Sequence, residues 1–197
     1  KLEGVASIDV AGVRLGAADP KWQPPADGPV MTPGSQVAFD VVIRNLLVGH
    51  RFPGGVLDIQ DTWIEVEVTD KQGKRLVASG ITHETDPDDE DTHVLRTLVV
   101  DEQGEVLEEH EMAKFRTQVQ TQTLGAREAH VIRYAFDVPT TLTAAQQPLT
   151  VAAKLRHRSR TLKLQAAVCR EAKTAVGKAF IEGAKGARSV EIDPCKP

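Results

Sequence analysis

The strictest β-strand pattern in this chain is Trp63-Ile64-Glu65-Val66-Glu67-Val68. Because successive side chains of a strand point to opposite faces, we expect the three aliphatic residues to face the core, with Trp63 and both glutamates on the other face. The turn sequence Asp70-Lys71-Gln72-Gly73-Lys74 follows, and its glycine suits the positive φ of a hairpin turn into a second strand over residues 75–79. This stretch therefore predicts an antiparallel β-sheet.

Similar strand patterns recur along most of the chain, with turn residues between the segments. The further predicted strands cover residues 6–15, 36–44, 95–100, 105–108, 115–121, 130–137 and 149–155. Strands that follow one another without intervening helices are typical of a sandwich, and not of alternating strand and helix. Together the segments predict a mainly β protein with seven to nine strands in an antiparallel, immunoglobulin-like β-sandwich.

The apolar spacing changes after Thr161, from the period of a strand to the period of a helix. The residues at helical spacing are Leu164, Val168, Ala172, Ala175, Val176 and Ala179, and Gly183 and Gly186 offer stops. We therefore expect one amphipathic C-terminal helix. The predicted organisation is one domain, with the β-sandwich over residues 1–160 and the helix and tail over residues 161–197 packed on it.

Composition fits a single globular domain. The 197 residues are 41% hydrophobic, while a mean hydropathy of −0.26 and the lack of a long apolar run argue against a membrane span. The net charge is −4 and Lys and Arg are dispersed, so nucleic acid is not an expected partner. The sequence begins at Lys1 with neither an initiator Met nor a signal segment, so we expect a processed or excised product.

The two cysteines, Cys169 and Cys195, are too few for a disulfide-rich scaffold and lack the C-x-x-C spacing of a redox or zinc site. We expect them to form one disulfide, which would pin the proline-containing tail to the helix. Two unrelated buried thiols are the alternative.

The first candidate for chemistry is the loop over residues 45–55, in which glycines flank the pair His50-Arg51. Glycines let the backbone approach a ligand closely, and imidazole is the commonest biological metal ligand. The alternative is a structural turn in which His50 bonds to Asp58 or to a backbone carbonyl.

The second candidate is an acidic loop over residues 84–91, with His83 and His93 at its ends. Its candidate metal ligands are Asp86, Asp88, Asp91 and His93. Closely spaced carboxylates suit Ca²⁺, which takes oxygen ligands. Asp91 stands where an EF-hand needs glycine, so a solvated acidic loop is the better explanation. The remaining histidines could converge on zinc or copper, although no local ligand pair is present. We predict no catalytic residues, because there is no G-x-S-x-G motif and neither cysteine has an evident base.

The loop around His50 also resembles part of a known protein family. Val48-Gly49-His50-Arg51-Phe52-Pro53-Gly54-Gly55, with Asn45 before it and Asp58 and Trp63 after it, resembles the haem-free C-terminal β-domain of exported multihaem c-type cytochromes, in the cytochrome c554-related group. The G-H-x-F-P core is the distinctive part. Weaker matches continue through Asp86-Pro87-Asp88, His93, residues 101–104, His110, residues 149–158 and Asp193-Pro194-Cys195, so the resemblance covers most of the chain.

The resemblance implies a non-catalytic accessory domain in periplasmic or extracellular electron transfer, which packs against haems. No C-x-x-C-H motif is present, so haem c is expected on a separate haem-bearing segment or cytochrome subunit, and not attached covalently to this chain. In that family His50 becomes a candidate axial haem ligand, Asp58 its orienting partner and Trp63 part of the contact face.

Two other classes stay open. One is a stand-alone exported metal-binding β-sandwich that holds copper or calcium through the histidines or the acidic loop. The other is an adhesion or carbohydrate-binding module, which is less favoured because aromatic residues make up 4% of the chain and sugar platforms need exposed rings.

Overall fold

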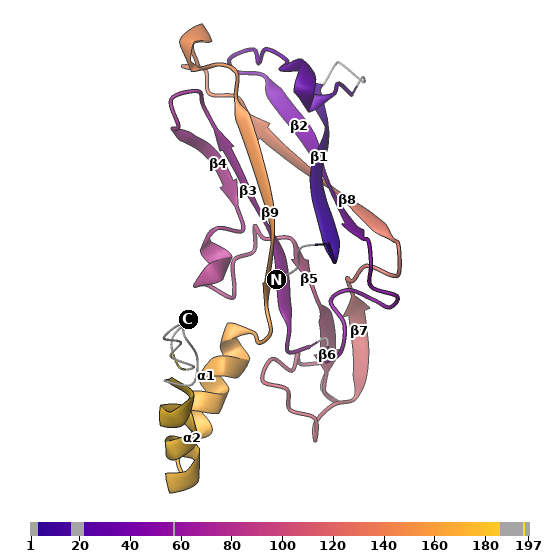
Figure 1. Ribbon diagram of the computed structural model, residues 1–197, viewed down its shortest axis with the longest axis vertical. Helices are drawn as coiled ribbons and strands as arrows, with labels where there is room; N and C mark the ends of the chain where they lie inside the picture. The colour runs from indigo at the N-terminus through magenta and orange to yellow at the C-terminus, as the bar shows by residue number, and fades with distance from the viewer. Residues whose placement is uncertain (1–3, 17–21, 57, 186–194, 196–197) are drawn as a thin grey trace.

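The computed structural model describes residues 4–16, 22–56, 58–185 and 195. Within these residues the chain forms two facing β-sheets, a small third sheet and two short C-terminal helices (Figure 1). The described strands are β1 (Ala6–Leu15), β2 (Gln36–Asn45), β3 (Asp61–Thr69), β4 (Arg75–Ser79), β5 (Val94–Leu95), β6 (Thr97–Val100), β7 (Thr117–Thr121), β8 (Ala129–Asp137) and β9 (Thr150–Arg158). The prediction of a mainly β, antiparallel sandwich is confirmed.

The two main sheets are built around β2 and β3. The first sheet has the order β1-β2-β8. In the second, β3 pairs with β9 along one edge, while β4 and β5 pair with opposite ends of its other edge. The small sheet consists of β6 and β7. All of these pairs are antiparallel.

The core lies between the two main sheets. Its most deeply buried aliphatic side chains come mainly from β2 and β3: Val37, Val41, Ile43, Ile64, Val66 and Val68. Phe39 of β2 packs against Tyr134 and Phe136 of β8, with ring centroids 5.6 and 6.3 Å apart. The predicted core-facing residues of the 63–68 stretch are therefore confirmed.

Strand β3 is also covered on its other face. Trp63 and Glu65 alternate with the core residues, yet they are only 4% and 7% exposed. Glu65 accepts hydrogen bonds from Lys154 and Arg156 of β9, at 2.6 and 2.8 Å. The long stems of these two side chains cover the strand while their charged ends pair with the carboxylate.

Two predicted strands differ from the structure. The segment predicted as one strand over residues 95–100 is divided at Arg96 into β5 and β6, which pair with different neighbours. Residues 105–108 form no strand, and the hairpin closes through an isolated bridge between Val100 and Val106. The strand that pairs with β6 over its length is β7, which comes later in the chain.

The predicted single helix is in fact two helices, α1 (Leu162–Glu171) and α2 (Ala175–Lys185). Thr161 caps α1 by accepting a hydrogen bond from the Leu164 N–H at 3.2 Å. Thr174 does the same for α2, accepting from the Gly177 N–H at 3.0 Å. Because Thr174 caps a new helix, the helical conformation is interrupted between Glu171 and Ala175. The expected boundary at residues 160 and 161 lies at the junction of β9 and α1.

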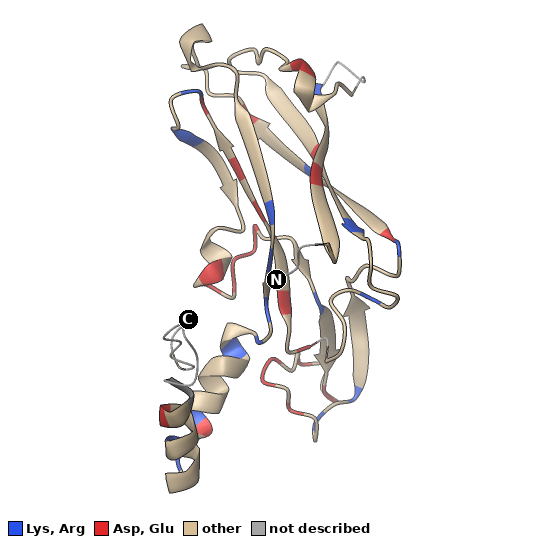
Figure 2. Cartoon of the chain, viewed as in Figure 1, with Lys and Arg blue, Asp and Glu red and all other residues tan. Residues whose placement is uncertain are grey.

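Several contacts tie α1 to its surroundings. Cys169 and Cys195 form the predicted disulfide. The Lys163 ammonium bonds to Asp88 at 2.6 Å and to Glu108 at 2.8 Å. Figure 2 shows acidic residues in the loop between β4 and β5, near the first turn of this helix. Among the described helices none is long and apolar enough to cross a membrane.

Candidate functional site

The candidate site is the loop over residues 46–56, which follows β2 and which we call the His50 loop. Asn45, only 1% exposed, holds its first half. Its amide donates hydrogen bonds to the carbonyls of His50 and Gly125, at 2.9 and 3.0 Å. Its side-chain oxygen, Oδ1, accepts a hydrogen bond from the Val48 N–H at 3.0 Å. One buried side chain therefore fixes the path of the backbone on both sides of the turn.

The second half of the His50 loop is anchored by Phe52. Its N–H donates to the Leu124 carbonyl at 2.7 Å, and its carbonyl accepts from the Leu124 N–H at 2.8 Å. Both side chains are buried in the core. Residues 46–51 therefore form a turn whose two ends are fixed to the sandwich.

His50 lies at the surface of this turn. Its Nδ1 is 2.8 Å from the Arg51 carbonyl oxygen. A carbonyl can only accept a hydrogen bond, so Nδ1 is the donor in this contact. A Cβ at Gly54 would lie 2.7 Å from Nδ1 and 2.9 Å from the Arg51 oxygen, so the ring position requires glycine there. The loop thus presents an exposed imidazole whose Nδ1 is held by the backbone.

Apolar side chains accompany His50 in the loop. Leu46, Leu47 and Val56 are 45%, 77% and 44% exposed. Exposed apolar side chains that gather in one segment are typical of an interaction surface. The chemistry available here is that of a nitrogen ligand with apolar neighbours.

Asp58 does not contact His50 in this structure. Its Oδ2 accepts a hydrogen bond from His110 Nδ1 at 2.8 Å. His110 lies in the segment before β7, 52 residues further along the chain. The partner that orients His50 is the Arg51 carbonyl, one of the two partners that the sequence left open.

Trp63 is buried and does not lie on an outer contact face. Its Nε1 donates to the Gly80 carbonyl at 2.9 Å. The His83 ring is 5.0 Å from the Trp63 ring, and the Arg158 guanidinium lies 4.7 Å from its centroid. Because these groups cover both the edge and the face of the indole, little of it remains for a partner.

The four candidate metal ligands do not come together. Asp86 accepts from the Asp88 N–H at 3.0 Å, and the Asp88 carboxylate bonds to Lys163. Asp91 donates its N–H to Asp89. Burial lowers the pKa of His93, whose ring is partly enclosed. Across residues 4–16, 22–56, 58–185 and 195, no group of three or more His, Cys, Asp or Glu side chains has metal-binding geometry.

A buried polar cluster was not predicted from the sequence. Asp61 bonds to His83 Nε2 at 3.0 Å and to Arg158 Nε at 2.8 Å. Burial raises the pKa of Asp61, but the hydrogen bonds and charges of His83 and Arg158 outweigh burial and hold that pKa below its usual value. Arg158 also donates to the carbonyls of His83 and Glu84, at 2.6 and 3.0 Å. The cluster fixes the short helical turn Thr82–Glu84 to β3 and β9.

No model of a known protein family and no curated protein sequence matches this chain. Among solved structures, a penta-haem cytochrome c552 from Thermochromatium tepidum superposes with a TM-score of 0.55 and 16% sequence identity. The match covers 89% of this chain and 37% of the cytochrome, so the chain spans little more than a third of that protein. Spo0M, a sporulation control protein from Bacillus subtilis, has a TM-score of 0.27 and 12% identity, over 80% of this chain and 49% of that one. The likeness to the cytochrome is one of fold.

Proposed function

We propose that this chain is a haem-free accessory domain of a multihaem cytochrome c, which packs against the haem-bearing part in electron transfer outside the cytoplasm. The observation that carries the proposal is the superposition of 89% of the chain on a penta-haem cytochrome. Because that cytochrome is much longer than this chain, its remaining length leaves room for a haem-bearing part. The proposal places haem on a separate segment or on a partner subunit.

The His50 loop supports a role at the haem interface. A histidine that ligates a metal usually donates its other ring N–H to a carbonyl or carboxylate, which fixes the tautomer and the ring orientation. His50 has this arrangement, with Nδ1 on the Arg51 carbonyl. A haem held there would supply the redox centre, and its axial ligand would influence its potential. The chain itself would position the imidazole through Asn45 and Gly54.

The apolar part of the loop supports the same interface. Leu46 and Leu47 are exposed in the same loop as His50, whose backbone carbonyl Asn45 holds in place. When a partner covers them, these side chains exclude water from the neighbourhood of the imidazole. Burying exposed aliphatic side chains also favours association, at roughly 25 cal/mol for each Å² of apolar area removed from water.

The disulfide supports a location outside the cytoplasm. Disulfides form and persist mainly in oxidising compartments such as the bacterial periplasm, and they are rare in the cytosol. The Cys169–Cys195 bond therefore fits the proposed periplasmic or extracellular site of electron transfer.

The test is a pair of histidine variants in the complete protein or complex that carries the haems. His50→Ala is expected to change the spectrum or the midpoint potential of one haem, because it removes a nitrogen ligand. His110→Ala is the control, since this imidazole is partly exposed but already bonded to Asp58. If both variants leave all haem spectra and potentials unchanged, His50 is not a ligand and the loop has a structural role.

A further inference from the structure

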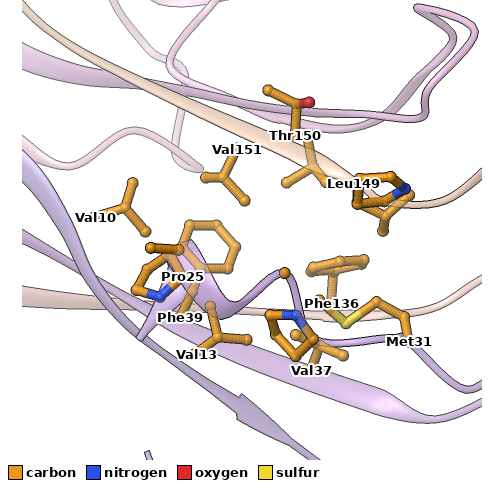
Figure 3. A pocket seen from close by; sticks show the side chains of 15 residues that line it. Val10, Val13, Pro25, Met31, Val37, Phe39, Phe136, Leu149, Thr150 and Val151 are labelled. Carbon is orange, nitrogen blue, oxygen red and sulfur yellow. The ribbon is translucent and has the colours of Figure 1, made fainter. Parts of the chain in front are cut away.

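A second site lies at the opposite end of the sandwich from the His50 loop. The loop follows the last residue of β2, whereas Val37 and Phe39 near the start of that strand line a cavity of about 360 Å³. The cavity lies between β1, β2 and β8 on one side and the first residues of β9 on the other (Figure 3). The segment around the short helical turn Pro25–Asp27 borders it.

The interior of this cavity is apolar. The apolar side chains that keep accessible surface there are half-buried: Val10, Phe136, Leu149 and Val151. They pack on the fully buried core residues Val37, Phe39 and Val68 behind them. Among the residues that the structure describes, the lining of the cavity includes no charged side chain, and the one polar side chain is the hydroxyl of Thr150. Thr150 is exposed at the start of β9. The cavity therefore combines an apolar interior with a hydroxyl near solvent.

The walls of the cavity are fixed by hydrogen bonds. The Gln147 side chain accepts from the Met31 N–H at 2.8 Å and donates to the Met31 carbonyl at 2.9 Å. This pair joins the segment before β2 to the segment before β9. Val13 and Gln23 exchange two backbone hydrogen bonds, which hold the Pro25–Asp27 turn against β1. A site fixed in this way is largely formed before a ligand arrives.

The size of the cavity indicates its occupant. Protein interiors contain few voids larger than a water molecule. An apolar cavity of about 150 Å³ stays dry and binds benzene, and drug-sized ligand sites begin at about 300 Å³. This pocket opens to solvent at its rim, and its volume of about 360 Å³ lies at the lower end of the range for small-molecule sites.

We propose that this cavity binds a small uncharged apolar molecule, of the size of a two-ring aromatic or a short aliphatic chain. The apolar part of the ligand occupies the space beside Phe136, Leu149 and Val151. A single polar group of the ligand lies near the Thr150 hydroxyl. A charged ligand is disfavoured, because the described part of the lining offers no opposite charge to offset its desolvation. This site is independent of the proposed haem interface.

The first test uses the uncharged fluorophore N-phenyl-1-naphthylamine with the folded chain. We expect saturable fluorescence enhancement with a stoichiometry of one. Naphthalene should displace the probe, whereas 2-naphthoate, of similar size but charged, should displace it at least tenfold less well. Absence of saturable binding, or equal displacement by the two competitors, would overturn the proposal.

The second test locates the binding. Ala26→Trp places a large ring at the exposed rim, and Val151→Phe fills the interior. Each is expected to weaken probe binding at least tenfold, with circular dichroism used to establish that the variant is folded. Ala113→Trp, at an exposed alanine in a turn outside the cavity lining, is the matched control and should bind as the unaltered chain does. Unchanged binding in a folded Ala26→Trp or Val151→Phe variant would show that the probe binds elsewhere.

Discussion

Asn45→Ala is the substitution that most directly probes how the chain holds the His50 loop. The Asn45 amide makes three hydrogen bonds, to the carbonyls of His50 and Gly125 and from the Val48 N–H. A buried hydrogen bond contributes about 1 kcal/mol net, so the loss of all three should lower the free energy of unfolding by about 3 kcal/mol. For a domain of this size that corresponds to a fall in Tm of roughly 6–12 °C.

Urea unfolding followed by circular dichroism measures this effect. We expect the midpoint to fall in Asn45→Ala while the m-value stays the same, because the surface exposed on unfolding hardly changes. Gln36→Ala is the control, since Gln36 is an exposed residue at the other end of the same strand. It should shift stability by less than about 0.5 kcal/mol. A loss in Asn45→Ala no larger than in the control would refute the argument that Asn45 fixes the loop.

Three further predictions concern other parts of the chain. His50 in the native protein should be the Nδ1–H tautomer by nitrogen NMR. Gly54→Ala should disturb this preference, whereas the control Gly49→Ala should not, because a Cβ at Gly49 meets no atom within 4 Å. An Nε2–H tautomer in the unaltered chain would contradict the geometry. The folded pKa of Asp61 is lowered, so the Asp61 carboxylate stabilises the fold above its unfolded pKa of about 3.9, and this stabilisation is lost as pH falls through the folded value. The acid-induced loss of stability should therefore be shallower in Asp61→Asn. Equal slopes of unfolding free energy against pH in urea titrations would contradict this. The Cys169–Cys195 bond, which joins residues 26 apart, should stabilise the fold by about 3.5 kcal/mol in the chain-entropy model, and mass spectrometry after alkylation without reduction should find neither thiol modified.

Much of the sandwich could be predicted because strand patterns are local. The alternation of Ile64, Val66 and Val68 placed these residues in the core, where they lie. The burial of Trp63 could not be predicted in this way. Its cover comes from His83 and from Arg158, which are distant in sequence and reach it only through the β3–β9 pairing and the turn before β5.

The same limit applies to the candidate site. The flanking glycines correctly singled out residues 45–55 as an unusual turn, and a backbone carbonyl was one of the partners considered for His50. The pairing of Asp58 with His110 depends on how the segment before β7 returns to β3, which no local pattern shows. The division of the C-terminal helix followed from the cap at Thr174, a local signal that the apolar periodicity obscured.

The most direct test of the proposed function is the haem content of the native assembly. The complete gene product, purified from its host through an affinity tag placed on this domain, should contain haem c in fixed ratio to this domain by the pyridine haemochrome spectrum. That haem should remain through size-exclusion chromatography, either on the same polypeptide or on a bound cytochrome subunit. A preparation in which the native protein elutes as a folded species without haem and without a haem-bearing partner would contradict the account.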